Sequence, residues 1–349
     1  MCVCVNIFTC MHSDYSNLIS LENLFQAWGE FRKGKAKRFD VQEFERNLED
    51  NLFELHQELR NKTYQHGNYY SFYVNDPKQR HIHKAEVRDR VVHHLLYKYL
   101  YGLFDKTFIF DSYSCRLDKG THRGVKRLEK FAREISQNYT QSCWALKCDI
   151  KKFFASVNHQ ILIKLLVKKV TDKDALWLLK QIIYSFHSGL GKDKGIPLGN
   201  LTSQIFANIY MNELDQFVKH KLKVKCYIRY ADDFLFLSKN KNLLFEYVDV
   251  LRQFLSNKLK LELHPDKIIF RKLEWGIDFL GYVVLPHYIL LRAKTKRRIF
   301  KKLKEKAGLE NFNQSAQSYL GYLGHANSFK LRQAIGNMVW LWNSSSMGA

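Results

Sequence analysis

The chain has 349 residues, of which 46% are hydrophobic, and its 56 Lys and Arg against 34 Asp and Glu give a formal net charge of +22. This length and apolar content predict a folded protein with two or three subdomains and exclude a disordered chain. So large a positive charge predicts a polyanionic partner, for which nucleic acid is the usual candidate. We find no apolar run long enough to span a bilayer and no lipidation motif, so a membrane partner is not expected.

The cysteines carry little functional information. They are Cys2, Cys4, Cys10, Cys115, Cys143, Cys148 and Cys226. Their odd number and the lack of a signal peptide predict reduced thiols in a cytoplasmic protein. The first three, even with His12, fit no common zinc spacing. We expect residues 1–19 to form an N-terminal tail without a targeting function, with Met1 or Met11 as the natural start.

Apolar and aromatic periodicity predicts the elements of the first half of the chain. They are helices over 18–64, a strand at 69–74, a turn at Asp76–Pro77, a returning strand at 78–83, and helices over 87–104 and 119–135.

The second half mixes strands and helices without regular alternation. Its predicted elements are a strand at 144–148, helices at 159–170 and 174–186, a glycine-rich loop at 189–199, a helix at 202–222, a hairpin at 226–237, a helix at 243–259, strands at 267–270 and 279–285, and a basic helical tail at 294–349. This order predicts an α+β fold and not a doubly wound parallel sheet.

The predicted hairpin at 226–237 has two adjacent carboxylates, Asp232 and Asp233, at its turn. The turn lacks the Asn-Gly or Asp-Gly that a hairpin built for stability prefers. Two like charges at a tight turn raise the energy of the ionised pair unless a cation neutralises them, and hard oxygen ligands suit Mg²⁺. The alternative is a solvated acidic turn.

A third carboxylate, Asp149, ends the apolar strand at 144–148, where a charge is costly unless it binds something. Lys151 and Lys152 follow it and suit an anionic ligand. Two metal ions held by three such acids lower the pKa of an attacking hydroxyl and neutralise charge on a phosphorus centre. For Asp149 alone, an acidic helix cap is the alternative.

These segments together resemble reverse transcriptases. Residues 149–154 (Asp-Ile-Lys-Lys-Phe-Phe) and 230–233 (Tyr-Ala-Asp-Asp) resemble the two metal-binding motifs, and residues 195–204 between them resemble the loop and helix that pack against the incoming nucleotide. The supporting segments are Arg80, 88–92 and 113–116 for the fingers, 263–267 for the later palm motif, and 279–282 for the primer grip. The resemblance covers about residues 20 to 340.

The resemblance implies an RNA-directed DNA polymerase with a right-hand fold. It implies fingers at 20–140 with 165–200, a palm of antiparallel sheet and helices at 141–285 around that insertion, and a helical thumb with a C-terminal tail at 286–349. The partners would be an RNA template, a DNA or RNA primer, the cDNA and dNTPs. Two Mg²⁺ ions would be held by Asp149, Ile150, Asp232 and Asp233, and the three aspartates would be catalytic.

The same resemblance implies further site residues. Those for the nucleotide are Lys78, Arg80, Phe154, Pro197, Leu198, Gly199, Gln204 and Lys267, and those for the template–primer are Arg116, Phe279, Leu280 and Gly281. Lys78 and Arg80 would donate to the triphosphate, unless they only form an exposed strand face. Phe154 would occupy the space of a ribose 2′-hydroxyl and select deoxynucleotides, with one more core phenylalanine as the alternative. Gly199 lets the backbone approach the base pair, and Lys267 would protonate the leaving pyrophosphate.

Within the family, residues 196–204 resemble reverse transcriptases of diversity-generating retroelements, because Leu198 and Gln204 stand where most relatives have glutamine and proline. This implies a bacterial or phage-encoded enzyme that misincorporates opposite adenines of a template-repeat RNA, with a small basic accessory protein as partner. Leu198 cannot donate the hydrogen bonds by which a glutamine tests the nascent pair, a loss of about 1 kcal/mol that relaxes selectivity. A packing leucine is the alternative. For the whole chain, a phage-defence or intron-like reverse transcriptase and a non-catalytic RNA-binding scaffold remain alternatives.

Overall fold

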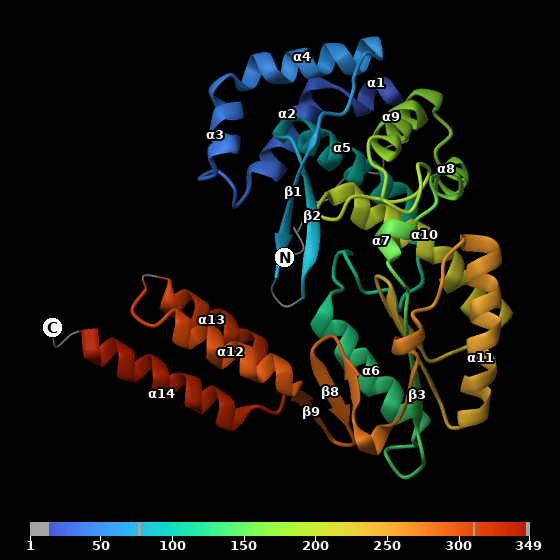
Figure 1. Ribbon diagram of the computed structural model, residues 1–349, viewed down its shortest axis with the longest axis vertical. Helices are drawn as coiled ribbons and strands as arrows, with labels where there is room; N and C mark the ends of the chain where they lie inside the picture. The colour runs from blue at the N-terminus through green and yellow to red at the C-terminus, as the bar shows by residue number, and fades with distance from the viewer. Residues whose placement is uncertain (1–13, 76–77, 310, 347–349) are drawn as a thin grey trace.

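The computed structural model describes residues 14–75, 78–309 and 311–346 (Figure 1). Three parts follow one another: an upper body of helices with a two-stranded hairpin, a central sheet with its helices, and a second sheet that leads into a C-terminal helical bundle. The first three cysteines and the predicted turn at Asp76–Pro77 lie outside the described residues. The observed mixture of antiparallel sheets and helices confirms the predicted α+β class.

The upper body forms because amphipathic helices pack around α5, whose buried residues lie on nearly all of its sides. Its elements are α1 (Tyr15–Leu18), α2 (Leu21–Arg32), α3 (Phe39–Arg46), α4 (Leu48–Asn61), β1 (Tyr69–Val74), β2 (Arg80–Ala85), α5 (Val87–Phe104), α7 (Phe153–Ser156), α8 (His159–Val167) and α9 (Lys173–Tyr184). Side-chain caps begin three of the helices: Ser20 accepts from the Asn23 amide in α2, Asn158 accepts from the Ile161 amide in α8, and Asp172 accepts from two amides of α9. The predicted helices and the predicted hairpin of this part are confirmed.

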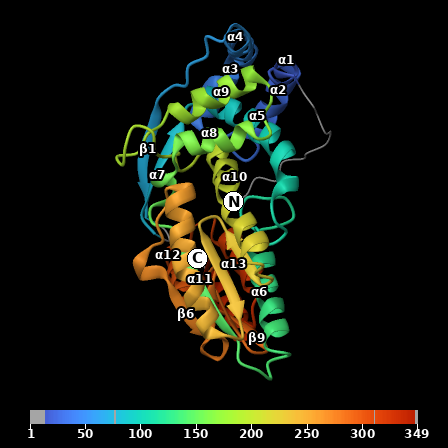
Figure 2. The same ribbon diagram turned by 90° about the vertical axis from the view of Figure 1, so that its right-hand side faces the viewer.

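The central sheet has the strand order β4-β5-β3-β6, and every neighbouring pair is antiparallel. Its elements are β3 (Trp144–Asp149), β4 (Tyr227–Tyr230), β5 (Asp233–Ser238) and β6 (Ile269–Lys272), with α6 (Thr121–Ile135), α10 (Leu201–Gln216) and α11 (Lys241–Phe254). Strand alternation sends Leu146 and Phe236 to the face covered by α11, while Ala145 and Leu235 pack with α6 on the other face. Figure 2 shows α11 in front of the sheet. α10 is buried along most of its length and joins the sheet to the upper body.

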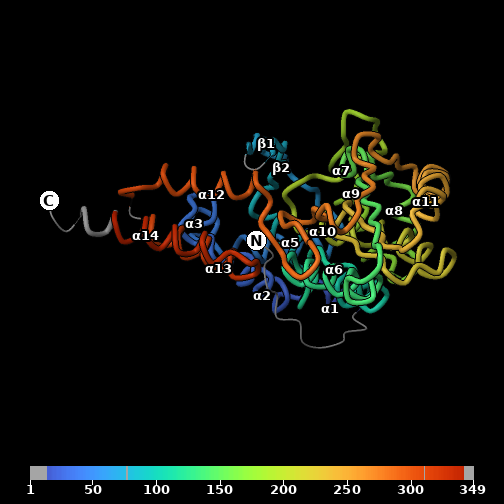
Figure 3. The backbone as a smooth tube through the Cα atoms, turned by 90° about the horizontal axis from the view of Figure 1, so that it is seen from below, coloured from blue at the N-terminus to red at the C-terminus, as the bar shows by residue number. Residues whose placement is uncertain are grey.

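The second sheet and the bundle complete the chain. Their elements are β7 (Ile277–Phe279), β8 (Tyr282–Leu285), β9 (Tyr288–Leu291), α12 (Ala293–Glu305), α13 (Phe312–Leu323) and α14 (Phe329–Ser346). Short turns of helix lie at η1 (Asp105–Thr107), η2 (Phe217–Lys221), η3 (Leu255–Leu259), η4 (Pro265–Lys267) and η5 (Leu273–Trp275). The three-helix bundle has its own small core and extends to one side of the sheets (Figures 1 and 3).

One predicted strand is wrong. Instead of a single strand at 279–285, the chain reverses at Leu280 and Gly281, which both have positive φ (52° and 89°), so that Phe279 pairs with Tyr282. An apolar leucine at the turn hides this hairpin from periodicity, and β9 was not predicted at all.

No helix in the described ranges is long and apolar enough to cross a membrane. The four cysteines of these ranges, Cys115, Cys143, Cys148 and Cys226, are thiols and not disulfides, as the sequence predicts for them. The last three are buried, and burial raises the pKa of the Cys148 thiol to about 12.

Candidate active site at the end of the central sheet

The structure brings the three predicted aspartates together at one end of the central sheet. Asp149 is the last residue of β3 and lies opposite Asp233, the first residue of β5. The turn between β4 and β5 consists of Ala231 and Asp232, and the positive φ of Ala231 (55°) makes it tight. Strand register and the tight turn therefore place the three aspartates at one end of the sheet, although Asp149 and Asp232 are 83 positions apart in the sequence.

Burial gives these carboxylates unusual electrostatics. Burial and, second, the charge of Asp149 raise the pKa of Asp232 to about 6. Burial also raises the pKa of Asp233, and the nearby Lys147 ammonium opposes that shift. Asp233 Oδ1 is buried and has no hydrogen-bond partner in the described part of the chain. A cluster of partly buried acids with an unsatisfied oxygen is stabilised by a cation.

Two lysines supply positive charge to the cluster. Lys267 Nζ lies 2.8 Å from Asp149 Oδ1, and Lys147 Nζ lies 3.2 Å from Asp233 Oδ2. Over residues 14–75, 78–309 and 311–346, no group of three or more His, Cys, Asp or Glu side chains is arranged to hold a metal ion. The donor set nevertheless fits Mg²⁺, which prefers carboxylate oxygens, and Asp233 Oδ1 is available as a ligand. A bound ion would have to share these carboxylates with the two ammonium groups.

Backbone hydrogen bonds fix the end of β3. The amide of His264 donates to the Asp149 carbonyl at 2.9 Å, and the amide of Lys151 donates to the Glu262 carbonyl at 2.9 Å. Ile150, between them, has a buried side chain and bridges to Leu263. Its side chain is apolar, so Ile150 has only its backbone carbonyl to offer a metal ion.

A buried arginine beneath the turn was missed by sequence reasoning. Arg229 is fully buried, and its Nη2 lies 2.7 Å from Asp215 Oδ2 on α10. Its Nη1 donates to the Ala231 carbonyl at 3.0 Å, so the guanidinium holds the turn from below. The signal was available: a lone arginine inside an apolar strand needs a buried acid as its partner.

The loop predicted to pack against the nucleotide runs along strand β2. The His83 amide donates to the Leu198 carbonyl at 2.8 Å. The Asn200 side chain donates to the His83 carbonyl at 2.8 Å and accepts from the Ala85 amide at 3.3 Å. The loop thus lies along β2 and is hydrogen-bonded to it, as a third segment beside the two strands of the hairpin.

The same loop is tied to α7 and α10. The Ile196 amide donates to the Phe154 carbonyl at 2.8 Å, and the Ser203 hydroxyl donates to the Pro197 carbonyl at 2.6 Å. Leu198 and Phe154 have half-buried side chains, as does Gln204 on the first turns of α10. These contacts join the predicted nucleotide-binding residues of the loop to the strand end that carries Asp149.

Gly199 permits the close approach of this loop to β2. Its φ is +118°, and a Cβ added there would lie 2.7 Å from Ile82 Cγ2. Gly199→Ala is therefore expected to lower the free energy of unfolding by about 1–3 kcal/mol. Urea denaturation measures the change. The matched control is Gly189→Ala in the same loop, where a Cβ meets no heavy atom of the described residues within 4 Å. Equal losses in the two variants would contradict the close-approach argument.

Apart from Arg116, the remaining predicted residues lie in two places. Lys78 and Arg80 are exposed where the β1–β2 hairpin turns. Phe279 is fully buried, and a Cβ on the neighbouring Gly281 would lie 2.7 Å from Tyr322 Oη of α13. Leu280 and Gly281 therefore lie where the second sheet meets the bundle.

Arg116 is not brought to the carboxylates. Its Nε donates to Asp105 Oδ1 at 2.6 Å, and its Nη1 donates to the Ile109 carbonyl at 2.8 Å. The side chain is 8% exposed. Since its donors already have protein acceptors, Arg116 braces the segment after η1, and its contact with the template–primer stays a prediction.

Comparisons with known proteins agree with this geometry. Residues 54–284 match the family model described as reverse transcriptase (RNA-dependent DNA polymerase). Protein YkfC of Escherichia coli (strain K12) is 23% identical over 232 residues, which cover 56% of this chain and 60% of YkfC. The group II intron-encoded protein LtrA of Lactococcus lactis subsp. cremoris is 23% identical over 307 residues, which cover 67% of this chain and 49% of LtrA. The chain thus spans between about half and three fifths of the length of these relatives.

Among solved structures, telomerase from Candida tropicalis in complex with a TWJ fragment of telomeric RNA has a similar fold. The TM-score is 0.50 at 14% identity, over 85% of this chain and 57% of that chain. Together with the family match, this similarity confirms the predicted α+β polymerase fold. The matched region includes β3, β4 and β5 with all three aspartates, and the chain therefore belongs to the reverse transcriptase (RNA-dependent DNA polymerase) family.

Proposed function

We propose that this chain is an RNA-directed DNA polymerase that extends a primer with deoxynucleotides on an RNA template. The observation that carries the proposal is the meeting of Asp149, Asp232 and Asp233 at one sheet end, with a raised Asp232 pKa and an unsatisfied Asp233 oxygen. Two Mg²⁺ ions held there would lower the pKa of the primer hydroxyl and neutralise charge on the transferred phosphoryl group. Asp149 and Asp233 would hold them with Asp232 and the Ile150 carbonyl.

The surrounding residues have roles that suit this reaction. Lys78 and Arg80 are exposed donors on the hairpin and would bind the triphosphate. Phe154 would lie against the sugar. Lys267 already has its ammonium at Asp149, where it would protonate the leaving pyrophosphate.

In this proposal the three parts of the chain are those of a right hand. The fingers would be residues 20–140 with 165–200, the palm residues 141–285 around that insertion, and the thumb with its C-terminal tail residues 286–349. The basic surplus would hold the template–primer through phosphate contacts that do not depend on sequence. The Leu280–Gly281 turn would contact the primer.

The direct test is primer extension on an RNA template with purified protein. We expect cDNA only when a divalent cation is present, and its loss on chelation. Asp233→Asn is the matched variant, since it keeps the side-chain shape and removes the charge. An Asp233→Asn protein that makes as much cDNA as the wild type would refute the metal-site assignment and favour a non-catalytic scaffold.

We further propose that the enzyme misincorporates opposite adenines of a template-repeat RNA, as in diversity-generating retroelements. Leu198 supports this proposal, because its apolar side chain belongs to the loop that would face the nucleotide. Its carbonyl is fixed by the His83 amide, so a side-chain change there leaves the loop anchored. The small basic accessory protein belongs to the same proposal and rests on the resemblance alone.

Leu198→Gln is expected to lower misincorporation opposite template adenines several-fold, because the amide restores a hydrogen-bonding check worth about 1 kcal/mol. Sequencing of cDNA made on an adenine-rich RNA measures the error spectrum. Leu190→Gln is the control, since Leu190 is exposed in the same glycine-rich loop. An unchanged spectrum in Leu198→Gln would remove Leu198 as the cause. Faithful copying of adenines by the wild type would favour an intron-like or phage-defence enzyme.

A further inference from the structure

Lys147 lies two residues before Asp149 on β3, so strand alternation places both side chains on the same face of the sheet. Its ammonium makes two contacts: Nζ lies 3.2 Å from Asp233 Oδ2, and it donates to the Asp278 carbonyl at 3.2 Å. The side chain is 18% exposed. A lysine held from two sides, with most of its stem covered, has one main position for its charge.

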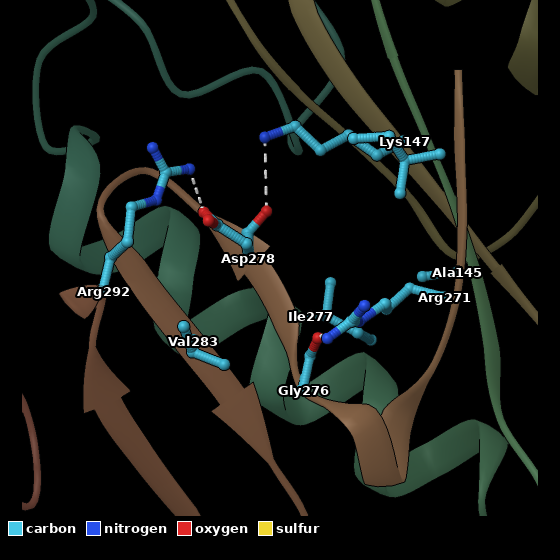
Figure 4. Close-up of a pocket in the computed structure, with 9 residues that line it drawn as sticks. Ala145, Lys147, Arg271, Gly276, Ile277, Asp278, Val283 and Arg292 are labelled. Atoms are coloured by element: carbon cyan, nitrogen blue, oxygen red, sulfur yellow. Dashed lines mark hydrogen bonds and ion pairs between the residues drawn. The ribbon is translucent and has the colours of Figure 1, made fainter. Parts of the chain in front are cut away.

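The second anchor of Lys147 is itself fixed. Asp278 belongs to β7, and its carboxylate forms an ion pair with Arg292, the residue that precedes α12 (Figure 4). Lys147, Asp278, Arg271 and Arg292 line a cavity of about 320 Å³ between the edges of the two sheets. Asp278 thus connects the lysine to the second sheet and to the first helix of the bundle.

On the other side, Lys147 engages only one oxygen of Asp233. Oδ2 faces the ammonium, whereas Oδ1 is buried and without a hydrogen-bond partner among the described residues. A carboxylate held in this way offers a metal ion one oxygen in a fixed direction. Without the lysine, the side chain can rotate and offer either oxygen or both.

We propose that Lys147 is a positioning residue that fixes the Asp233 carboxylate through Oδ2, leaves Oδ1 as the metal ligand, and competes with divalent cations for that carboxylate. This proposal rests on the proposed polymerase function of the site. Lys147 acts through Asp233 and not by contact with the reacting atoms. Its role differs from that of Lys267, which pairs with the other strand's aspartate.

The proposal predicts effects of opposite sign for Lys147→Met. Divalent cations should bind about three-fold more tightly or better, because a competing positive charge close to the site is gone. The kcat should fall about ten-fold with little change in the KM for dNTP, because Asp233 no longer presents one oxygen in one direction. Lys147→Arg keeps the charge and should restore most of the kcat. General structural damage would weaken cation binding and turnover together.

The experiment measures Mn²⁺ binding to the full chain without nucleic acid, from the electron paramagnetic resonance signal of free Mn²⁺, beside steady-state primer extension. Lys272→Met is the matched control. Lys272 is the last residue of the neighbouring strand β6, and its ammonium pairs with Glu274 at 3.6 Å and not with the aspartates. We expect the control to match the wild type in both measurements. Unchanged or weaker Mn²⁺ binding in Lys147→Met would overturn the proposal, as would an unchanged kcat. A wild type that neither binds Mn²⁺ nor extends a primer would instead refute the polymerase function.

Discussion

Asp232→Asn is expected to abolish DNA synthesis and at the same time to make the protein more stable. Loss of a metal-binding carboxylate should lower the rate by about 10³-fold or more, which corresponds to about 4 kcal/mol of transition-state stabilisation. The gain in stability has a different cause. Burial and the Asp149 charge raise the pKa of Asp232 from 3.8 to about 6, so the ionised side chain opposes folding at neutral pH. Removing that charge should add about 1–3 kcal/mol to the free energy of unfolding without divalent cations.

The pH dependence of this gain follows from the raised pKa. The folded protein binds the Asp232 proton more tightly than the unfolded chain, so protonation stabilises the fold below about pH 4. That stabilisation is lost as the pH rises through about 6. The difference in stability between Asp232→Asn and the wild type should therefore be largest above pH 6 and vanish toward pH 4.

Thermal unfolding in a chelating buffer across pH 4–8 tests the stability half, and primer extension tests the activity half. We expect a rise of roughly 2–5 °C in Tm at neutral pH. Asp266→Asn is the control, because this nearby carboxylate is 87% exposed and should change neither quantity. A less stable Asp232→Asn protein would show that the ionised Asp232 side chain does not destabilise the folded protein as we expect.

Arg229→Met is expected to be the most destabilising single change near the site, with a loss of about 3–5 kcal/mol in the free energy of unfolding. It leaves the Asp215 carboxylate charged and fully buried, and among the described residues only the Tyr227 hydroxyl then still donates to it, at 2.8 Å. Urea denaturation at neutral pH measures the loss, which is large relative to the stability of a typical domain.

The double variant Arg229→Met with Asp215→Leu separates the two roles of the arginine. Replacing both charges with apolar side chains should recover most of the stability, because no buried charge then lacks a partner. Activity should stay low, because the Ala231 carbonyl has lost its donor and the turn with Asp232 is no longer held from below. If the double variant is as unstable as the single one, the buried charge is not the source of the loss.

The sequence allowed the fold to be predicted where local pattern and tertiary structure agree. The helices around α5 and the hairpin of β1 and β2 follow from periodicity, and the β4–β5 turn follows from two acids between apolar runs. The Leu280–Gly281 turn was missed because its leucine continues an apolar pattern, and only the backbone conformation marks the reversal.

For the site, the aspartates were found because charge at a strand end is conspicuous in a sequence. Lys147 and Arg229 were missed because each owes its position to a partner on another element, Asp278 on β7 and Asp215 on α10. For Arg116, a motif suggests a nucleic-acid contact, and the side chain also bonds to Asp105 in the protein, so that the template–primer contact stays a prediction.

The hydrogen bonds between the loop and β2 affect how the β1–β2 hairpin could move. A two-stranded ribbon is barely stable in water by itself, so the direction of the β1–β2 hairpin depends on its contacts with the body, among them the hydrogen bonds to Leu198 and Asn200. A swing of the hairpin toward a bound triphosphate would therefore pull on Leu198, whose loop is also held to α7 and α10. In the proposed function, binding of the phosphates by the hairpin and checking of the base pair at Leu198 would therefore be mechanically coupled through these hydrogen bonds.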